Sequence, residues 1–208
     1  MIISSRKKFI FFHTPKVAGS SLNAALRKYA NIPSSRFYNY LLDYVGTSKF
    51  FGVYPRHISP FQLSKYLPEE KFNTYTKFAF VRNPFDWHVS QYHFHRQNDF
   101  AVFFPLFKKM DFNEYLVWAK DNVHLSKSNQ YEFLSDENGQ LMVDFIGKIE
   151  TIEKSFEEIK AKLGIKAKLP HRNKSTRSDS YRQYYSDLGI ELVNELNSKD
   201  LAFFGYSF

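Results

Sequence analysis

The chain has 208 residues, of which 43% are hydrophobic and 19% aromatic, and this is enough apolar material for the packed core of one domain. It contains no cysteine, which excludes disulfides, thiol nucleophiles and zinc–thiolate sites and fits a reducing compartment, for which we expect the cytoplasm. The formal net charge of +8 is unevenly placed, because residues 1–42 hold seven Lys or Arg and no acid, and residues 160–186 hold eight against one Asp. Such clusters indicate either an anionic partner or a solvated basic surface.

No apolar run approaches the roughly 20 residues that a membrane span needs, and the N-terminal residues lack the features of a signal peptide. Internal repeats, low-complexity tracts and linkers long enough to divide the chain are absent from the sequence. We therefore expect a single domain over residues 1–208, without a membrane span.

The first recognisable unit is a strand followed by a helix. Residues 8–14, KFIFFHT, form a continuous apolar run that is typical of a strand buried on both faces of a parallel sheet. Apolar residues then recur at helical spacing from Leu22 to Tyr29, and Ser20 or Ser21 is the expected N-cap of this helix.

Two more units repeat this order. Residues 77–81, KFAFV, predict a strand, and Pro84 suits the first turn of the helix that follows. Residues 142–150 predict a third strand, after which a helix continues until Gly164 can end it. Shorter helices are expected over residues 60–67, over residues 112–120 and from Ser180 to about Asn197, with an irregular basic loop at 165–180. Strands that alternate with helices predict an α/β fold with a mostly parallel sheet.

The loop between the first strand and its helix has the composition of an anion site. In a parallel sheet, ligands bind beyond the carboxyl ends of the strands, where a helix directs free N–H groups and the positive end of its dipole at them. Gly19 would allow a close approach of the backbone, Lys16 would supply a charge, and Ser20 and Ser21 would donate hydrogen bonds. The order of Lys and Gly differs from the loop of nucleoside triphosphatases, and a plain turn with a solvated lysine is the alternative.

Three segments resemble the carbohydrate-type sulfotransferases that use 3′-phosphoadenosine 5′-phosphosulfate (PAPS), such as the catalytic domains that act on heparan or chondroitin. HTPKVAGSSL (13–22) is similar to the phosphosulfate loop of that family, and FAFVRNPFDWHVSQY (78–92) to its strand and helix for the 3′-phosphate. LPHRNKS (169–175) is similar to its late loop over the adenosine end. The motifs occur in the family's order, and the resemblance implies a P-loop-like three-layer sandwich whose central, mostly parallel sheet is flanked by helices.

The resemblance also implies roles for individual residues. It assigns the phosphosulfate to Pro15, Lys16, Val17, Ala18, Gly19, Ser20 and Ser21. It assigns the 3′-phosphate to Arg82 and Ser90, and the adenosine end to Arg172, Lys174 and Ser175, for which a plain basic loop is the alternative. Lys16 would neutralise the charge that grows on the leaving oxygen, a contribution on the order of 3 kcal/mol for a preorganised donor.

His57 matches the family's proposed catalytic base, a histidine ahead of a short helix, and an imidazole titrates near neutral pH. Among the other histidines, His13 would fix loop geometry, and those of the second helix would be surface or core residues. Asp86 is expected to cap the start of that helix. Glu150, at a strand end, would orient a base, bind the acceptor or form a salt bridge.

The sequence thus predicts in-line transfer of a sulfuryl group from PAPS to a hydroxyl, on a saccharide or glycosylated molecule, with PAP (adenosine 3′,5′-bisphosphate) as product. Histidine and acid spacings of a metal site are missing, so we expect no metal. Lacking a membrane anchor and cysteines, the chain is similar to a compact bacterial or phage-type relative made of the catalytic domain alone. The alternatives are a polyanion-binding or nucleic-acid-binding module without catalysis, and a nucleotide kinase with a degenerate phosphate loop. The oligomeric state stays open.

Overall fold

The structure is a computed structural model that describes residues 1–31, 55–101, 103–123, 129–170 and 180–208. The chain divides into two compact units. Unit 1 comprises Met1–Val81 and Glu132–Asn173, and unit 2 comprises Arg82–Tyr131 and Lys174–Phe208. Within the described residues, no helix is long and apolar enough to cross a membrane.

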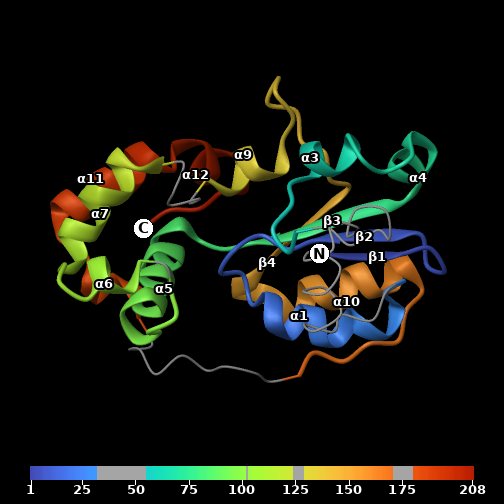
Figure 1. Ribbon diagram of the computed structural model, residues 1–208, viewed down its shortest axis with the longest axis horizontal. Helices are drawn as coiled ribbons and strands as arrows, with labels where there is room; N and C mark the ends of the chain where they lie inside the picture. Colours follow the sequence, from blue (N-terminus) through green and yellow to red (C-terminus); the bar gives the residue numbers. More distant parts are fainter. Residues whose placement is uncertain (32–54, 102, 124–128, 171–179) are drawn as a thin grey trace. The chain divides into compact units, whose positions relative to one another are not determined.

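Unit 1 contains a four-stranded sheet with the strand order β1–β2–β3–β4 (Figure 1). Its strands are β1 (Ile2–Ser4), β2 (Phe9–Phe12), β3 (Thr76–Val81) and β4 (Phe145–Lys148). β2, β3 and β4 pair in parallel, which confirms the predicted mostly parallel sheet, whereas β1 pairs with β2 antiparallel and was not predicted. Phe12 pairs with Ala79, so β2 and β3 are neighbours and end at the same edge of the sheet.

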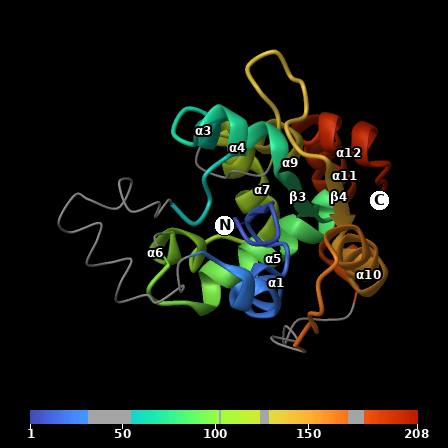
Figure 2. The ribbon, with the colours of Figure 1, turned by 90° about the vertical axis from the view of Figure 1, so that its right-hand side faces the viewer.

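Helices cover both faces of this sheet, which confirms the three-layer α/β architecture. α1 (Gly19–Leu26) and α10 (Ile152–Leu163) lie on one face, and α3 (Pro60–Ser64) and α4 (Glu69–Thr74) lie on the other (Figure 1, Figure 2). The short 3-10 helices η1 (Arg27–Tyr29) and η2 (Ile149–Thr151) follow α1 and precede α10.

Successive side chains of a strand point to opposite faces of the sheet, so each strand can pack against the helices on both sides. Phe9 and Phe11 of β2 are fully buried with Phe78 and Phe80 of β3 in the core that α1 and α10 also enter. All four residues of β2 are buried, as the continuous apolar run predicts for a strand covered on both faces. α10 ends at Gly164, whose φ of 57° is left-handed, and this confirms the predicted stop.

Unit 2 is helical in its described residues. Its elements are α5 (Pro84–Gln97), α6 (Phe104–Phe107), α7 (Phe112–Asp121), η3 (Tyr181–Tyr184), α11 (Asp187–Leu196) and α12 (Ser198–Phe204), and α9 (Gln130–Leu134) spans the division between the units. The helical stretch predicted from Ser180 is therefore two elements, because the backbone is extended at Tyr185 and Ser186, and Ser186 caps α11.

A buried polar junction links three elements of unit 2. His88 on α5 is fully buried, with Nδ1 2.9 Å from the Tyr115 hydroxyl of α7 and Nε2 2.9 Å from Oδ1 of Asn197. Because an amide oxygen only accepts, His88 donates through Nε2 and accepts from Tyr115 through Nδ1. Burial lowers the pKa of His88 to about 4, so it is a neutral core residue near neutral pH, which is one of the two expectations for it.

Candidate functional site

The loop between β2 and α1 has an uncommon backbone. Lys16 and Ala18 have φ angles of 61° and 50°, in the left-handed region, and they alternate with Val17 and Gly19, which do not. A left-handed residue other than glycine costs on the order of 1–3 kcal/mol, so such residues persist where the surroundings enforce them, often at functional sites. Residues that alternate between right-handed and left-handed conformations turn successive N–H groups toward one point, and the φ signs of this loop are those expected of such a nest for an anion.

α1 begins immediately after this nest. Its N-cap is Ala18, which makes no side-chain capping bond, and the backbone N–H groups of Ser21 and Leu22 return to the Ala18 carbonyl at 3.0 and 3.2 Å. The expectation that Ser20 or Ser21 caps the helix is therefore wrong, because the left-handed Ala18 starts the helix earlier. A helix start without a side-chain cap presents N–H groups that an anion can satisfy.

Thr14 lies at the beginning of the same loop. Only 1% of the residue is exposed, and among the described residues its hydroxyl oxygen has no hydrogen-bond partner. A buried hydroxyl without a partner costs about 1–3 kcal/mol. An unsatisfied donor beside an anion nest is consistent with a ligand that binds there.

The imidazole of His13 leaves no room for a side chain at residue 19, so glycine is required there. A Cβ atom placed on Gly19 would lie 1.4 Å from Nε2 of His13, so the imidazole occupies the space that any side chain would need. Asn23, one turn further along α1, donates to the Gly19 carbonyl at 2.7 Å and lies 3.4 Å from Nδ1 of His13. His13 therefore fixes loop geometry, as the sequence predicts, by packing against the start of α1.

His57 lies beside His13. Their ring centroids are 4.6 Å apart, and Nδ1 of His57 lies 2.8 Å from the His13 carbonyl oxygen. A carbonyl only accepts, so the Nδ1–H of His57 donates, and the neutral ring then carries its lone pair on Nε2. His57 is exposed, whereas His13 is buried. The arrangement holds His57 in the tautomer that a general base needs.

His13 itself is held neutral. Nε of Arg56 donates to its Nδ1 at 3.1 Å, which leaves the ring proton on Nε2. Burial, with smaller contributions from the positive groups nearby including Arg56, lowers the pKa of His13 to about 2. A ring that stays neutral at physiological pH and already accepts a hydrogen bond suits a structural role better than proton transfer.

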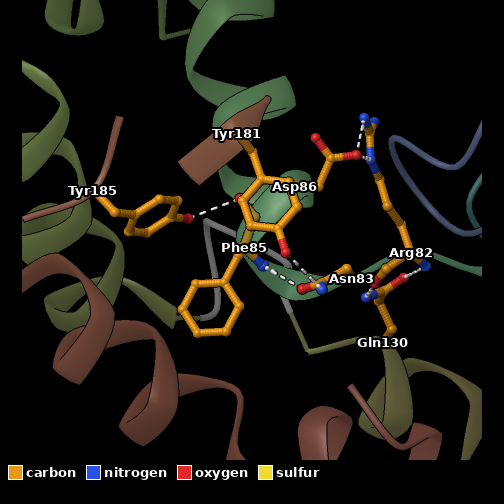
Figure 3. Close-up of polar contacts among 7 residues, drawn as sticks. All are labelled: Arg82, Asn83, Phe85, Asp86, Gln130, Tyr181 and Tyr185. Atoms are coloured by element: carbon orange, nitrogen blue, oxygen red, sulfur yellow. Dashed lines mark hydrogen bonds and ion pairs between the residues drawn. The ribbon is translucent and has the colours of Figure 1, made fainter. Parts of the chain in front are cut away.

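Arg82, the first residue of unit 2, is held by both its side chain and its backbone (Figure 3). Its Nε and Nη2 contact the same oxygen of Asp86 at 2.6 and 2.5 Å, and the two side chains are only 12% and 18% exposed. The Gln130 amide accepts from the Arg82 N–H at 2.9 Å and donates to the Arg82 carbonyl at 2.8 Å. Arg82 is thus a preorganised cation at the end of β3.

The cap of α5 is Asn83 and not Asp86, so that prediction is wrong. The side chain of Asn83 accepts from the N–H of Phe85 at 3.0 Å, and its amide nitrogen donates to the Tyr181 hydroxyl and to the Ser207 carbonyl (Figure 3). Asp86 lies in the first turn of α5, three residues after the cap, where its carboxylate pairs with Arg82. Ser90 follows on α5, four residues after Asp86, and therefore on the same side of the helix.

A pocket of about 560 Å³ adjoins the loop in unit 1. It is bordered by Ala18 and Ser21 at the start of α1, by α10, and by Leu169 and Pro170. The structure thus brings the first and third sequence motifs together at one pocket. His171, Arg172, Lys174 and Ser175, which continue the third motif, lie outside the described residues.

The predicted site residues are therefore distributed over both units. Lys16, which is half-buried, and His57 belong to unit 1, and Arg82 and Ser90 belong to unit 2. The sequence reasoning did not find Thr14, Arg56 or Gln130. No group of three or more metal-binding side chains occurs in the described part of the chain. Glu150 lies in η2, directly after β4.

Comparison with known proteins gives one result. A profile described as "Sulfotransferase family" matches residues 1–207. Searches of curated proteins and of solved structures returned no match. The profile covers nearly the whole chain, including the loop after β2, the Arg82 turn and the late loop, so this chain belongs to the sulfotransferase family, whose members transfer a sulfuryl group from PAPS to a hydroxyl-bearing acceptor.

Proposed function

We propose that residues 1–208, with both units, act as one catalytic domain that moves the sulfuryl group of PAPS to a hydroxyl on a saccharide or glycosylated molecule and releases PAP. The observation that carries this proposal is the nest, in which Lys16 and Ala18 are left-handed at the end of a parallel strand and ahead of a helix without a side-chain cap. These features fit an anionic group at this loop.

The phosphosulfate end of the donor would bind at the nest. Its ligands would be Pro15, Lys16, Val17, Ala18, Gly19, Ser20 and Ser21, mostly through backbone N–H groups and hydroxyls. The Thr14 hydroxyl, which has no hydrogen-bond partner among the described residues, adds a donor that the sequence motifs do not predict. The pocket between Ala18 and Leu169 has the volume of a small-molecule site and is our choice for the adenosine end.

The 3′-phosphate would bind Arg82 and Ser90. An arginine held against Asp86 needs little reorganisation when it meets a phosphate, and its planar group matches phosphate oxygens. Arg172, Lys174 and Ser175 of the late loop remain our predicted ligands for the remainder of the nucleotide.

PAPS supplies the sulfuryl group. The acceptor oxygen forms a bond to sulfur while the bond from sulfur to the 5′-phosphate oxygen breaks, and the acceptor proton passes to Nε2 of His57. The hydrogen bond from Nδ1–H to the His13 carbonyl selects the tautomer in which Nε2 of the neutral ring carries the lone pair. Lys16 stabilises the negative charge that develops on the leaving phosphate oxygen. No metal is required for these steps.

Two finer points belong to the same proposal. The absence of cysteine fits a reducing compartment, and we place the protein in the cytoplasm. Phe100 of unit 2 is 98% exposed, and because an exposed aromatic ring suits stacking against a sugar ring, it supports a saccharide acceptor.

The test is donor binding followed by transfer. We expect isothermal titration to give one PAP per chain and a much weaker affinity for AMP, which lacks the 3′-phosphate. PAPS carrying labelled sulfate, offered to a panel of glycans, glycolipids and simple alcohols, should label a saccharide. Equal affinity for PAP and AMP would contradict the donor site, and labelling of simple alcohols alone would contradict the acceptor class.

A further inference from the structure

A series of buried polar side chains in unit 2 ends at Arg82. We call it the Asp200 network, and it consists of His88, Asn197, Asp200 and Gln130, none of which is more than 1% exposed. A buried polar group is costly unless it is hydrogen-bonded, so each member of the network depends on its neighbours for partners. The contacts can be followed from the core of unit 2 to the backbone of Arg82.

Asp200, in the first turn of α12, is the centre of this network. Its Oδ2 accepts from the Gln130 N–H at 3.0 Å and from Nδ2 of Asn197 at 3.2 Å. Its Oδ1 accepts from the Tyr131 N–H at 2.7 Å. The two N–H groups are the first of α9, where a helix has no partners of its own for them and where its dipole favours an acid. The carboxylate of Asp200 therefore fixes the first turn of α9.

Asn197 ties Asp200 to the junction of His88 with Tyr115. The Oδ1 of Asn197 accepts from Nε2 of His88 at 2.9 Å, which directs its Nδ2 toward the carboxylate. The reverse orientation of this amide would place its oxygen against the carboxylate oxygen, and neither atom can donate. The orientation of Asp200 is thus set by contacts in the core of unit 2.

Gln130, the first residue of α9, connects the network to Arg82 (Figure 3). Its amide oxygen accepts from the Arg82 N–H at 2.9 Å, and its amide nitrogen donates to the Arg82 carbonyl at 2.8 Å. A residue on a neighbouring strand would make the same pair of bonds, but Arg82 follows the end of β3 and receives them from a side chain. Because Asp200 holds the backbone of Gln130, this amide is already in place.

Arg82 is consequently held at two points. Asp86 contacts its guanidinium, and Gln130 holds its backbone. The guanidinium lies at the end of a long side chain, so a small rotation of the backbone at residue 82 displaces it much further than it displaces Cα. A group that is held in its binding position before the ligand arrives loses less conformational freedom on binding.

We propose that Gln130 and Asp200 are positioning residues that give this protein its preference for a nucleotide with a 3′-phosphate over one without it. This role rests on the proposed function, in which Arg82 binds the 3′-phosphate. Gln130 acts through the backbone of Arg82, and Asp200 acts through Gln130. Loss of either residue therefore weakens one contact of the nucleotide and leaves the others intact.

The test compares the affinities for PAP and AMP, measured by isothermal titration on the full chain. Gln130→Met keeps the length of the side chain but removes both hydrogen bonds to Arg82. We expect PAP affinity to fall about tenfold, as for a weakened charge-assisted contact, and AMP affinity to change less than about twofold. Gln130→Asn, whose amide is one carbon too short for both bonds, should show the same selective loss and serves if Gln130→Met does not fold.

Two further variants test the network and provide a control. Asp200→Asn leaves every direct contact of Arg82 in place but directs an amide N–H at a group that donates, so PAP affinity should fall several-fold and AMP affinity should not change. Ser186→Ala removes the cap of α11, which is also in unit 2, and should lower stability. Its ratio of PAP affinity to AMP affinity should remain that of the native chain.

The double variant Arg82→Ala/Gln130→Met separates positioning from a general loss of structure. Its PAP affinity should lie within about twofold of that of Arg82→Ala, because the side chain that Gln130 positions is absent. A further, additive loss in the double variant would overturn the proposal. Equal losses for PAP and AMP in the Gln130 variants, or a native preference for PAP in both of them, would do the same.

Amide hydrogen exchange, followed by NMR, tests the contact without any nucleotide. The Arg82 N–H should exchange faster in Gln130→Met than in the native chain, and at the native rate in Ser186→Ala. Native exchange in Gln130→Met would overturn the role of Gln130 whatever the nucleotide affinities. Equal affinities of the native chain for PAP and AMP would instead contradict the donor site, and this role with it, so the two failures give different results.

Discussion

At the scale of single residues, Lys16 combines a charge with a strained backbone in the proposed donor loop. We expect Lys16→Ala to lower kcat by a factor of about 100 to 1,000, because charge neutralisation in the transition state is worth about 3–4 kcal/mol. PAP affinity, measured by titration, should change by less than about tenfold, since the nest supplies the remaining contacts. Lys71→Ala is the control, and native turnover in Lys16→Ala would remove this lysine from the mechanism.

We expect Asp86 to affect the affinity for PAP through its ion pair with Arg82. Asp86→Asn removes the ion pair that orients the guanidinium, so PAP affinity should fall about tenfold, as expected for a charge-assisted contact. AMP affinity should change little, because AMP lacks the group that Arg82 would bind. Arg82→Ala should produce the same selective loss, more strongly. Asp99→Asn, an exposed acid just beyond α5, is the control, and equal losses for PAP and AMP would argue against this placement.

His57 has the geometry of a base that acts through Nε2. His57→Ala should lower kcat by about 100-fold to 10,000-fold and leave PAP affinity unchanged, because general base catalysis contributes on that order. Added imidazole should restore part of the activity, a result that a purely structural role would not give. His13→Ala, which should mainly reduce stability, serves as the comparison. Full activity of the His57 variant would require another base.

At the scale of an element, the β2–loop–α1 segment depends on the contact between Gly19 and His13. Gly19→Ala places a methyl group where the imidazole lies, although the φ of Gly19 itself permits alanine. We expect a loss of about 1–3 kcal/mol in the free energy of unfolding, the usual cost of overpacking. The measurement is urea unfolding.

A double variant makes that prediction specific. In His13→Ala/Gly19→Ala the ring that causes the clash is absent, so the loss should be clearly smaller than the sum of the single losses. Additive losses would show that Gly19 is required for another reason, such as close approach of the donor.

The elements also show where sequence patterns succeed. The strands β2 and β3 and the stop of α10 at Gly164 follow from local signals, namely continuous apolar runs and a left-handed glycine. The predicted N-caps of α1 and α5 were wrong, because the position of a cap depends on how the preceding loop enters the helix and not on the residue type alone. The ion pair of Arg82 with Asp86 could have been found from its spacing of four residues.

At the scale of the whole molecule, buried histidines couple stability to pH. In the folded chain the pKa of His88 is about 4, whereas that of a free imidazole is about 6.5. Between pH 6.5 and pH 4, therefore, the unfolded state takes up this proton and the folded state does not. The free energy of unfolding therefore falls as pH is lowered from 6.5 to 4, by about 1.4 kcal/mol per pH unit for each such histidine. His13 contributes in the same direction.

The measurement is urea unfolding at pH 7, 6 and 5. His88→Gln should be less stable than the native chain at pH 7, because it disturbs the junction with Tyr115 and Asn197. It should nevertheless lose about 2 kcal/mol less between pH 7 and pH 5, since one titrating group is gone. Parallel losses in the two proteins would contradict the low pKa of His88.

The sequence by itself determined the α/β architecture, the parallel strands and the family, because apolar runs, helical periodicity and the loop motifs are local patterns. Tertiary structure decided which residues lie next to one another: the His13 ring on Gly19, the His13 carbonyl that selects the tautomer of His57, the Gln130 amide on Arg82, and the Tyr29 hydroxyl on the backbone of Lys166. These contacts join residues that are 6 to 137 positions apart in the sequence, and no local pattern encodes them. They form only when packing of the core brings the segments together, since the free energy of that packing is a property of the whole chain.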